Sequence, residues 1–113
     1  MSKKDYWVYI LLCENQSYYT GYTDNLEKRF LSHLNGTGGC KYTRSFKPLH
    51  IAQCWIIDGD KPLAMKLERD IKKKSKQQKL ELIQQPTSLS ADPRVQPFKP
   101  IPFRNIPSSN NPV

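Results

Sequence analysis

Two apolar runs near the start of the chain are rich in aromatic and β-branched residues. Residues 6–13 read Tyr-Trp-Val-Tyr-Ile-Leu-Leu-Cys and residues 17–22 read Ser-Tyr-Tyr-Thr-Gly-Tyr, with Glu-Asn-Gln between them. This composition, interrupted by a short polar turn, is typical of a β-hairpin. We therefore predict that the chain begins with two antiparallel strands.

The length of the hairpin loop decides which tyrosines share a face of the sheet, because successive side chains of a strand point to opposite faces. A loop with an odd number of residues pairs Tyr9 with Gly21, and Gly21 then leaves open space over the Tyr9 ring. The same register pairs Leu11 with Tyr19 and places Tyr9 and Tyr19 diagonally on one face. An even loop separates these two tyrosines.

The hairpin is followed by a pattern with the period of a helix. Leu26, Phe30 and Leu34 recur every fourth residue and form one buried stripe. Asp24 is the expected N-cap, and the glycine at position 36 is expected to end the helix.

The next regular segments alternate between strand and helix. Residues 49–57 are apolar enough for a central strand. A helix is predicted from about 61 to 74, capped by Asp60, and a shorter one from about 75 to 84. Glu68 lies beside the apolar stripe of the longer helix, at roughly 90° by the helical period. A carboxylate in that position is either an exposed ion-pair partner or a partly sheltered ligand.

Residues 36–48 are predicted to be a loop that is glycine-rich at first and then basic and aromatic. Lys41, Arg44 and Lys47 surround Tyr42, an arrangement typical of phosphate contacts with a stacking ring. A basic surface loop without a ligand is the alternative interpretation.

The composition changes after residue 84. Seven of the nine prolines lie in residues 85–113, where Ser, Asn and Gln are also frequent. Proline at this density cannot continue a helix or a sheet ladder. We predict a folded domain of residues 1–84 and a flexible, irregular tail of residues 85–113. Part of this tail could be fastened to the domain by its apolar residues Phe98, Ile101, Phe103 and Ile106.

Charge and cysteine content narrow the choice of partners. The 113 residues carry a formal net charge of +8, which favours a polyanion, nucleic acid first and an anionic membrane second. No signal segment precedes the first strand, and no apolar run approaches the ~20 residues of a membrane span. With three cysteines, we expect a cytoplasmic protein with reduced thiols. The spacing of His33, Cys40, His50 and Cys54 matches no zinc-finger pattern.

Several short motifs in this order are specific when they are taken together. They are Val8-Tyr9, Tyr19-Thr20-Gly21, Arg29-x-x-x-His33, Lys41-Tyr42-Thr43-Arg44 and Glu68 in a basic helix. Over residues 5–83 this constellation resembles the GIY-YIG endonuclease superfamily, in particular its small single-domain bacterial branch. Trp7 and Thr20 replace the first glycine and the second isoleucine of the motif that gives the family its name.

The resemblance implies an α+β fold, with a three-stranded antiparallel sheet flanked by helices, and hydrolysis of DNA phosphodiesters at a single Mg²⁺ or Mn²⁺ site. By position, Glu68 would bind the metal and Arg29 the scissile phosphate. Tyr9 and Tyr19 would orient water and phosphate, and His33 would assist proton transfer. The candidate nucleic-acid contacts are Lys41, Tyr42, Arg44, Lys47 and Lys72.

DNA, branched or damaged, is thus the expected partner, in repair or recombination. Neither a membrane nor a particular protein partner is indicated by the sequence, although the proline-rich tail is a region where a protein could bind. A non-cleaving nucleic-acid-binding module on the same fold is the alternative function. Tyrosines in a hairpin are also common as packing residues, so the sequence leaves a structural role for Tyr9 and Tyr19 open.

Overall fold

The computed structural model describes residues 4–37 and 41–98, apart from the side chains of Lys41 and Arg44. Its elements are β1 (Tyr6–Cys13), β2 (Tyr18–Thr23), α1 (Leu26–Asn35), α2 (Lys41–Ser45), β3 (Pro48–Ile57), α3 (Lys61–Lys72), α4 (Lys76–Gln84), the 3₁₀ helix η1 (Pro86–Leu89) and β4 (Val95–Phe98). The strands form one antiparallel sheet in the order β2-β1-β3-β4.

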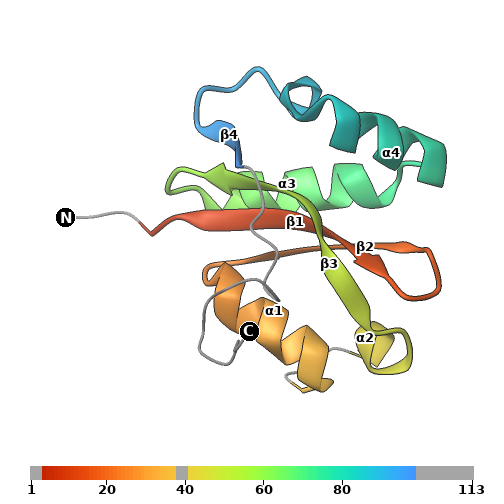
Figure 1. The fold of residues 1–113 in the computed structure, drawn as a ribbon. Helices are drawn as coiled ribbons and strands as arrows, with labels where there is room; N and C mark the ends of the chain where they lie inside the picture. The colour runs from red at the N-terminus through yellow and green to blue at the C-terminus, as the bar shows by residue number, and fades with distance from the viewer. Residues whose placement is uncertain (1–3, 38–40, 99–113) are drawn as a thin grey trace, which may run out of the picture.

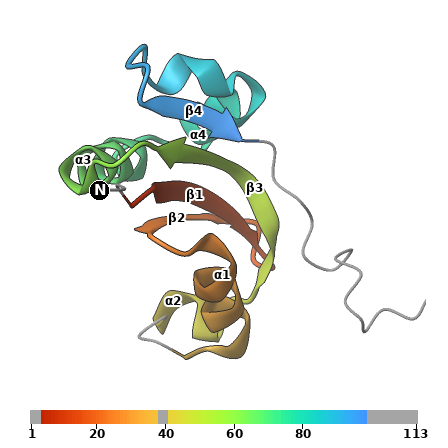
Figure 2. The same cartoon turned by 90° about the vertical axis from the view of Figure 1, so that its left-hand side faces the viewer.

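Helices cover both faces of this sheet. The helices α1 and α2 lie on one face, and α3 and α4 lie on the other (Figures 1 and 2). Because side chains alternate between the two faces along each strand, the sheet contributes residues to two cores. Val8 and Trp55 pack with α3, whereas Tyr9 and Cys54 belong to the second core, together with Phe30 of α1. The fold is an α+β architecture of three layers.

The hairpin has the register that places Tyr9 and Tyr19 on one face. Tyr9 pairs with Gly21, and Leu11 pairs with Tyr19. Of the two registers that the sequence left open, the structure therefore has the one of an odd loop. Consequently the two tyrosines lie on the α1 side of the sheet, where both belong to the core under that helix.

The N-cap of α1 is Asn25, so the prediction of Asp24 is wrong. The Asn25 side chain accepts a hydrogen bond from the backbone N–H of Lys28 at 3.0 Å. Asp24 instead forms an ion pair with Lys4 at 3.1 Å. Both residue types cap helices well, so the choice depends on where the preceding strand ends. Gly36 ends the helix as predicted, in the left-handed region with φ 68°.

The sheet has four strands, not the three that were predicted. β4 pairs with β3 along its outer edge, where a proline is tolerated because one side of an edge strand needs no partner. The Trp55 indole also donates a hydrogen bond to the carbonyl oxygen of Pro86 at 2.9 Å. Residues 86–98 are thus part of the folded domain, contrary to the predicted irregular tail, and residues 99–113 lie outside the described residues.

The predicted loop of residues 36–48 contains a short helix. Residues 41–45 form α2, which was not predicted because the glycines that precede it are typical of a loop. Residues 38–40, including Cys40, lie outside the described residues. Cys13 and Cys54 are both free and buried.

Within the described part of the chain, no helix combines the length and the apolar character that crossing a bilayer requires.

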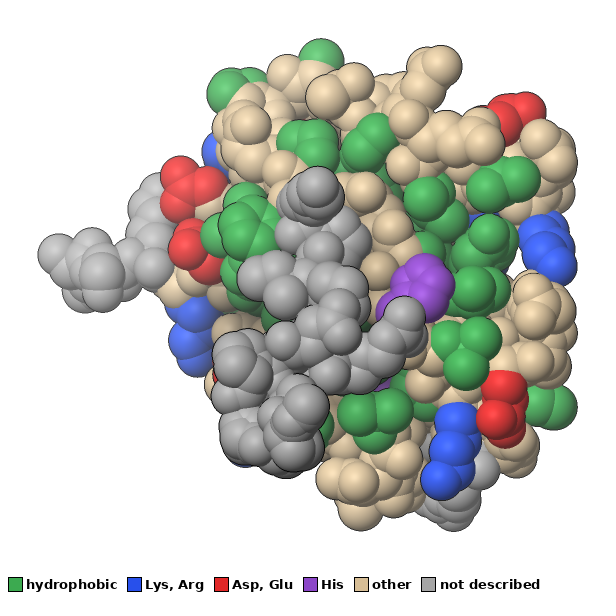
Figure 3. Space-filling view, viewed as in Figure 1, with side chains coloured by type: hydrophobic (Ala, Val, Ile, Leu, Met, Phe, Trp, Pro, Cys, Tyr) green, Lys and Arg blue, Asp and Glu red, His purple; other side chains and the backbone are tan. Residues whose placement is uncertain are grey.

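The face of the molecule seen in Figure 3 carries mostly hydrophobic and uncharged polar side chains, with Lys and Arg at its margins. Leu31, Leu49 and Phe98 are the most exposed large hydrophobic side chains among the described residues. The visible part of this face is therefore not where the positive charge of the chain is concentrated.

Candidate active site

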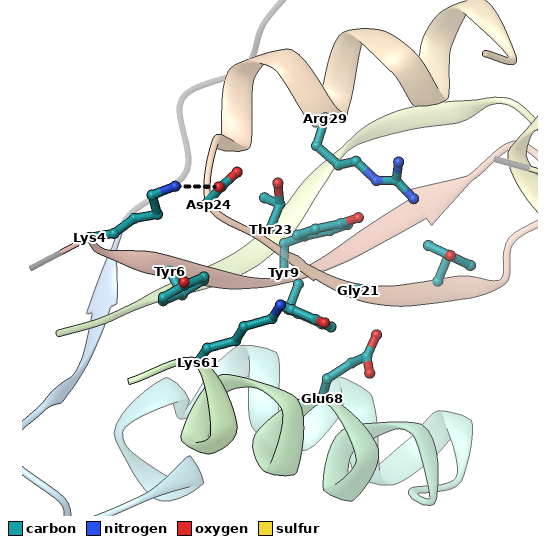
Figure 4. Close-up of a pocket in the computed structure, with 11 residues that line it drawn as sticks. Lys4, Tyr6, Tyr9, Gly21, Thr23, Asp24, Arg29, Lys61 and Glu68 are labelled. Carbon is teal, nitrogen blue, oxygen red and sulfur yellow. Dashed lines mark hydrogen bonds and ion pairs between the residues drawn. The ribbon is translucent and has the colours of Figure 1, made fainter. Parts of the chain in front are cut away.

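A polar pocket of about 530 Å³ opens at the edge of the sheet formed by β2, between α1 and α3. Figure 4 shows α1 on one side of the strands and α3 on the other, with side chains from both reaching into the space between them. The pocket is lined by Lys4, Tyr6, Tyr9, Tyr19, Gly21, Tyr22, Thr23, Asp24, Arg29, Lys61 and Glu68.

Four of the five predicted catalytic residues meet in this pocket, although they come from four different elements. β1 and β2 contribute Tyr9 and Tyr19, α1 contributes Arg29, and α3 contributes Glu68. Figure 4 shows the Arg29 guanidinium and the Glu68 carboxylate directed into the pocket from opposite sides. A cation, a carboxylate and two phenols are thus brought together around one cavity.

Gly21 has no side chain because the Tyr9 ring occupies that space. A Cβ atom at position 21 would lie 2.6 Å from Cζ of Tyr9 and closer still to its hydroxyl oxygen. Such contacts are too short for any side chain larger than hydrogen. The glycine therefore allows the phenol of Tyr9 to lie flat against β2, with its hydroxyl at the wall of the pocket.

His33, the fifth predicted catalytic residue, does not line the pocket. It is fully buried behind the two tyrosines, with its ring centroid 5.7 Å from that of Tyr9 and 5.1 Å from that of Tyr19. Its Nε2 atom lies 2.8 Å from the hydroxyl oxygen of Tyr9, and its Nδ1 atom lies 2.8 Å from the hydroxyl oxygen of Thr43. His33 can therefore act on the pocket only through its neighbours.

The buried position of His33 disfavours its charged form. Burial, and secondly the positive charge of Arg29, lower the pKa of His33 to about 4. At neutral pH the imidazole is thus uncharged, with one nitrogen acting as a donor and the other as an acceptor.

This shift makes stability depend on pH. The unfolded chain binds the His33 proton with a pKa near 6.5, so acid favours the unfolded state as the pH falls below that value. Between pH 7 and pH 5 we expect the free energy of unfolding to fall by about 2 kcal/mol, as measured by denaturant titration. The decrease should persist in His50→Gln. An NMR titration in which His33 takes up its proton near pH 6.5 in the folded state would contradict this prediction.

The environment of Glu68 suits a divalent cation. Its side chain is 16% exposed, and one carboxylate oxygen lies 3.4 Å from the ammonium group of Lys72. A hard cation such as Mg²⁺ prefers oxygen ligands and keeps several waters, so a single carboxylate facing a polar pocket fits it. Among the described residues, no three His, Cys, Asp or Glu side chains are grouped so that they could hold a metal ion together.

Tyr42, a predicted nucleic-acid contact, lies beside the pocket and makes specific contacts with the hairpin. Its ring stacks on Tyr19 at a centroid distance of 5.6 Å, and Phe46 packs against it at 5.3 Å. Its hydroxyl forms hydrogen bonds with Ser17 and Asn15. Tyr42 is 36% exposed, so it supports Tyr19 and still has one accessible side.

The other predicted nucleic-acid contacts are less closely grouped. Lys72 pairs with Glu68, whereas Lys47 is exposed beside the hairpin loop, where its backbone N–H donates a hydrogen bond to Glu14. The side chains of Lys41 and Arg44 lie outside the described atoms.

Sequence reasoning did not select Lys61, although Figure 4 shows its ammonium group directed into the pocket. Lys61 precedes Glu68 by seven residues, which is about two turns of α3, so both side chains lie on one side of the helix. The seven-residue spacing could therefore have predicted that Lys61 lies on the same side of the helix as Glu68. The contact of Thr43 with His33 could not be predicted either, because it joins two helices and follows no sequence period. The remaining lining residues that were not selected are Lys4, Tyr6, Tyr22, Thr23 and Asp24.

Comparison with known proteins yields consistent matches. The family model described as the GIY-YIG catalytic domain matches residues 5–81. A UPF0213 protein of Syntrophus aciditrophicus is 42% identical over 85 residues, which cover 75% of this chain and 94% of that protein. A UPF0213 protein of Clostridium perfringens is 46% identical over 77 residues, which cover 68% of this chain and 81% of that protein. The solution NMR structure of a UPF0213 protein from Bacillus halodurans is 35% identical, covers 79% of this chain and 88% of that chain, and has a TM-score of 0.40.

Proposed function

Because this chain belongs to the GIY-YIG catalytic domain family, we propose that it is a metal-dependent endonuclease that hydrolyses phosphodiester bonds in DNA. The observation that supports this proposal best is the meeting of Tyr9, Tyr19, Arg29 and Glu68 around one pocket. Branched or damaged DNA, as met in repair or recombination, is the substrate class that we propose for it.

Arg29 is proposed to bind the scissile phosphate. A phosphodiester is already anionic, so attack by water needs neutralisation of the charge that builds up on the phosphoryl oxygens. The planar guanidinium can donate two parallel hydrogen bonds to these oxygens in a fixed geometry, whereas an ammonium group acts more as a point charge. Its direction into the pocket, opposite Glu68, suits this role.

Glu68 is proposed to hold one Mg²⁺ or Mn²⁺ ion. When bound, this ion supplies Lewis-acid stabilisation of the phosphate and lowers the pKa of bound water. The carboxylate is sheltered but still faces the pocket, and Lys72 is exposed enough to leave the ion pair at little cost.

Tyr9 and Tyr19 are proposed to orient the attacking water and the phosphate, and one of them to accept the proton of that water. A phenol oxygen can accept a hydrogen bond from that water and then its proton, and cations in the same pocket stabilise the negative charge that develops during the attack. Arg29 and Lys61 are such cations. His33 is proposed to hold Tyr9 in place and to assist its proton transfer from behind, without contact with the substrate.

A panel of nucleic acids tests this proposal. Single-stranded, duplex, flapped and branched DNA, together with RNA, are incubated with the protein in Mg²⁺, in Mn²⁺ and in excess chelator. We expect cleavage of at least one DNA with metal and none with chelator, because the neutralisation of charge depends on the ion.

The alternative function, a non-cleaving nucleic-acid-binding module, is favoured by the net charge of +8. It predicts binding that weakens steeply with salt, and no product from any member of the panel with either metal. That outcome would replace the proposed nuclease by the binding module.

A further inference from the structure

The ammonium group of Lys61 reaches into the pocket without an acidic partner. Lys61 is the first residue of α3, and its side chain is part of the pocket lining together with that of Glu68. Figure 4 shows both side chains directed from the helix into the space below the strands. Among the described residues, no carboxylate forms an ion pair with Lys61. The charge of this ammonium group is therefore available to an anion in the pocket.

The two carboxylates of the pocket lining have partners other than Lys61. Asp24 forms an ion pair with Lys4 at 3.1 Å, and Glu68 forms one with Lys72 at 3.4 Å. Neither of them thus neutralises Lys61, although all three side chains face one cavity. A cation that lines a polar pocket in this way suits an anionic group of the substrate.

We propose that Lys61 binds the phosphate next to the scissile one, on the strand that is cut. This assignment rests on the proposed function, in which Arg29 and the metal ion at Glu68 hold the scissile phosphate itself. Lys61 is thereby a substrate-binding residue, and the pocket has a second phosphate subsite. The cut strand then follows α3 across the pocket.

The dimensions of the pocket favour a second phosphate over a further contact to the first. Lys61 and Glu68 are seven residues apart, which is about 10 Å along the axis of α3. Since their side chains form no ion pair, the ammonium group and the carboxylate do not converge on one point. The cavity of about 530 Å³ lies in the range of pockets that hold ligands much larger than a phosphate. A sugar and a second phosphate therefore fit beside the scissile group.

The chemistry of an ammonium group suits a phosphate that does not react. It is a compact point charge on a flexible stem, with three donors that rotate to meet the phosphate oxygens. A contact of this kind carries no information about the base, so it strengthens binding equally for every sequence. Binding energy from a part of the substrate that does not react also helps to hold the reacting phosphate in place.

Binding of a short single-stranded oligothymidylate to the full chain tests the contact without cleavage. Lys61→Met keeps the length of the side chain and removes its charge. In chelator we expect the affinity to fall about tenfold, the size of effect of one charge-assisted contact. The plot of log K against log salt concentration should become shallower by about 0.7, the value for one phosphate contact on a single strand.

Lys76→Met is the matched control for this titration. Lys76 is also an exposed lysine that begins a helix directly after its N-cap, but it is not among the residues that line the pocket. It should bind the oligothymidylate like the parent. An equal loss of affinity in Lys61→Met and Lys76→Met would mean that only the net charge matters, and would overturn the proposal.

Cleavage of modified DNA locates the phosphate that Lys61 contacts. An uncharged methylphosphonate is placed in turn at each position beside the scissile phosphate, in the strand that the parent cuts. At the contacted position, we expect kcat/KM of the parent to fall about tenfold and that of Lys61→Met to change by less than about twofold, because the variant has already lost the contact. Equal effects on both proteins at every position would overturn the proposal.

The kinetic constants on unmodified DNA distinguish binding from chemistry. Lys61→Met should raise KM about tenfold and lower kcat by no more than about threefold, because the phosphate that it contacts does not react. Lys61→Arg retains the charge and should stay within about threefold of the parent in KM. A loss confined to kcat would contradict the assignment.

The two readouts separate the failure of this proposal from the failure of the proposed function. If the parent binds DNA but cleaves none, the nuclease proposal fails, and the binding titrations still decide whether Lys61 contacts a phosphate. If the parent cleaves and Lys61→Met binds and cleaves equally well, the second phosphate subsite is wrong and the nuclease proposal stands. A parent that binds no DNA would overturn both proposals.

Discussion

Replacing Glu68 by alanine is expected to reduce metal-dependent cleavage by about a thousandfold or more and to leave DNA binding largely intact. Glu68 lines the pocket together with Arg29 and the two tyrosines, whereas Asp24, the other carboxylate of the lining, forms an ion pair with Lys4. Its loss removes the proposed metal ligand, and the affinity for DNA depends mainly on the many cations that remain. The fold should tolerate the change, because the ion pair with Lys72 is partly exposed and surface pairs contribute little.

The measurement is single-turnover cleavage in Mg²⁺ beside a binding titration in chelator. Glu81→Ala, at an exposed carboxylate on α4, is the matched control and should cleave like the parent. Glu68→Gln, which keeps the shape and removes the charge, should be as inactive as Glu68→Ala. If Glu68→Ala cuts as fast as the parent, the proposed metal site is wrong, even though the chain could still be a nuclease.

The second large effect is expected for Gly21→Ala. The added methyl group would lie 2.6 Å from Cζ of Tyr9, which must then leave its place between β2 and His33. Overpacking of this kind costs about 1–3 kcal/mol in the free energy of unfolding. A displaced Tyr9 should also reduce kcat by about a hundredfold, because small errors in position are costly in an active site.

Denaturant titration and cleavage kinetics of Gly21→Ala measure both parts of this effect. The hydroxyl of Tyr9 is its closest atom to the added methyl group, so Tyr9→Phe should relieve part of the clash. A double-mutant cycle is therefore expected to show that Gly21→Ala is less destabilising in the Tyr9→Phe background than in the parent. Equal destabilisation in both backgrounds would mean that the contact with Tyr9 is not the cause.

Much of this arrangement could be predicted from local patterns. The two-residue period of the hairpin places Tyr9 and Tyr19 on one face once the loop is odd, and the structure has this register. The helical period places Glu68 beside a buried stripe, and only 16% of the side chain is exposed there. Both predictions succeed because each depends on one element and its immediate partner.

Other features depend on contacts that no local pattern contains. Asp24 and Asn25 are equally good caps in isolation, and the end of β2 decides between them. Thr43 meets His33 only because α2 folds onto α1. The strand Val95–Phe98 is hidden by prolines that would exclude a central strand but are tolerated at an edge. In each case the tertiary neighbour determines the outcome.

The fourth strand also affects how the chain behaves towards copies of itself. β4 occupies the outer edge of β3, and it lies beyond residues 5–81, the part that matches the family. A chain shortened to that part would leave β3 as an open edge with unpaired N–H and C=O groups, which is a template for pairing with another molecule. With β4 in place, the two edges of the described sheet are β2, where the pocket lies, and β4, a short strand of four residues that includes Pro97 and offers little backbone for pairing. The appended strand thus guards against aggregation on one side and leaves the other side accessible to substrate.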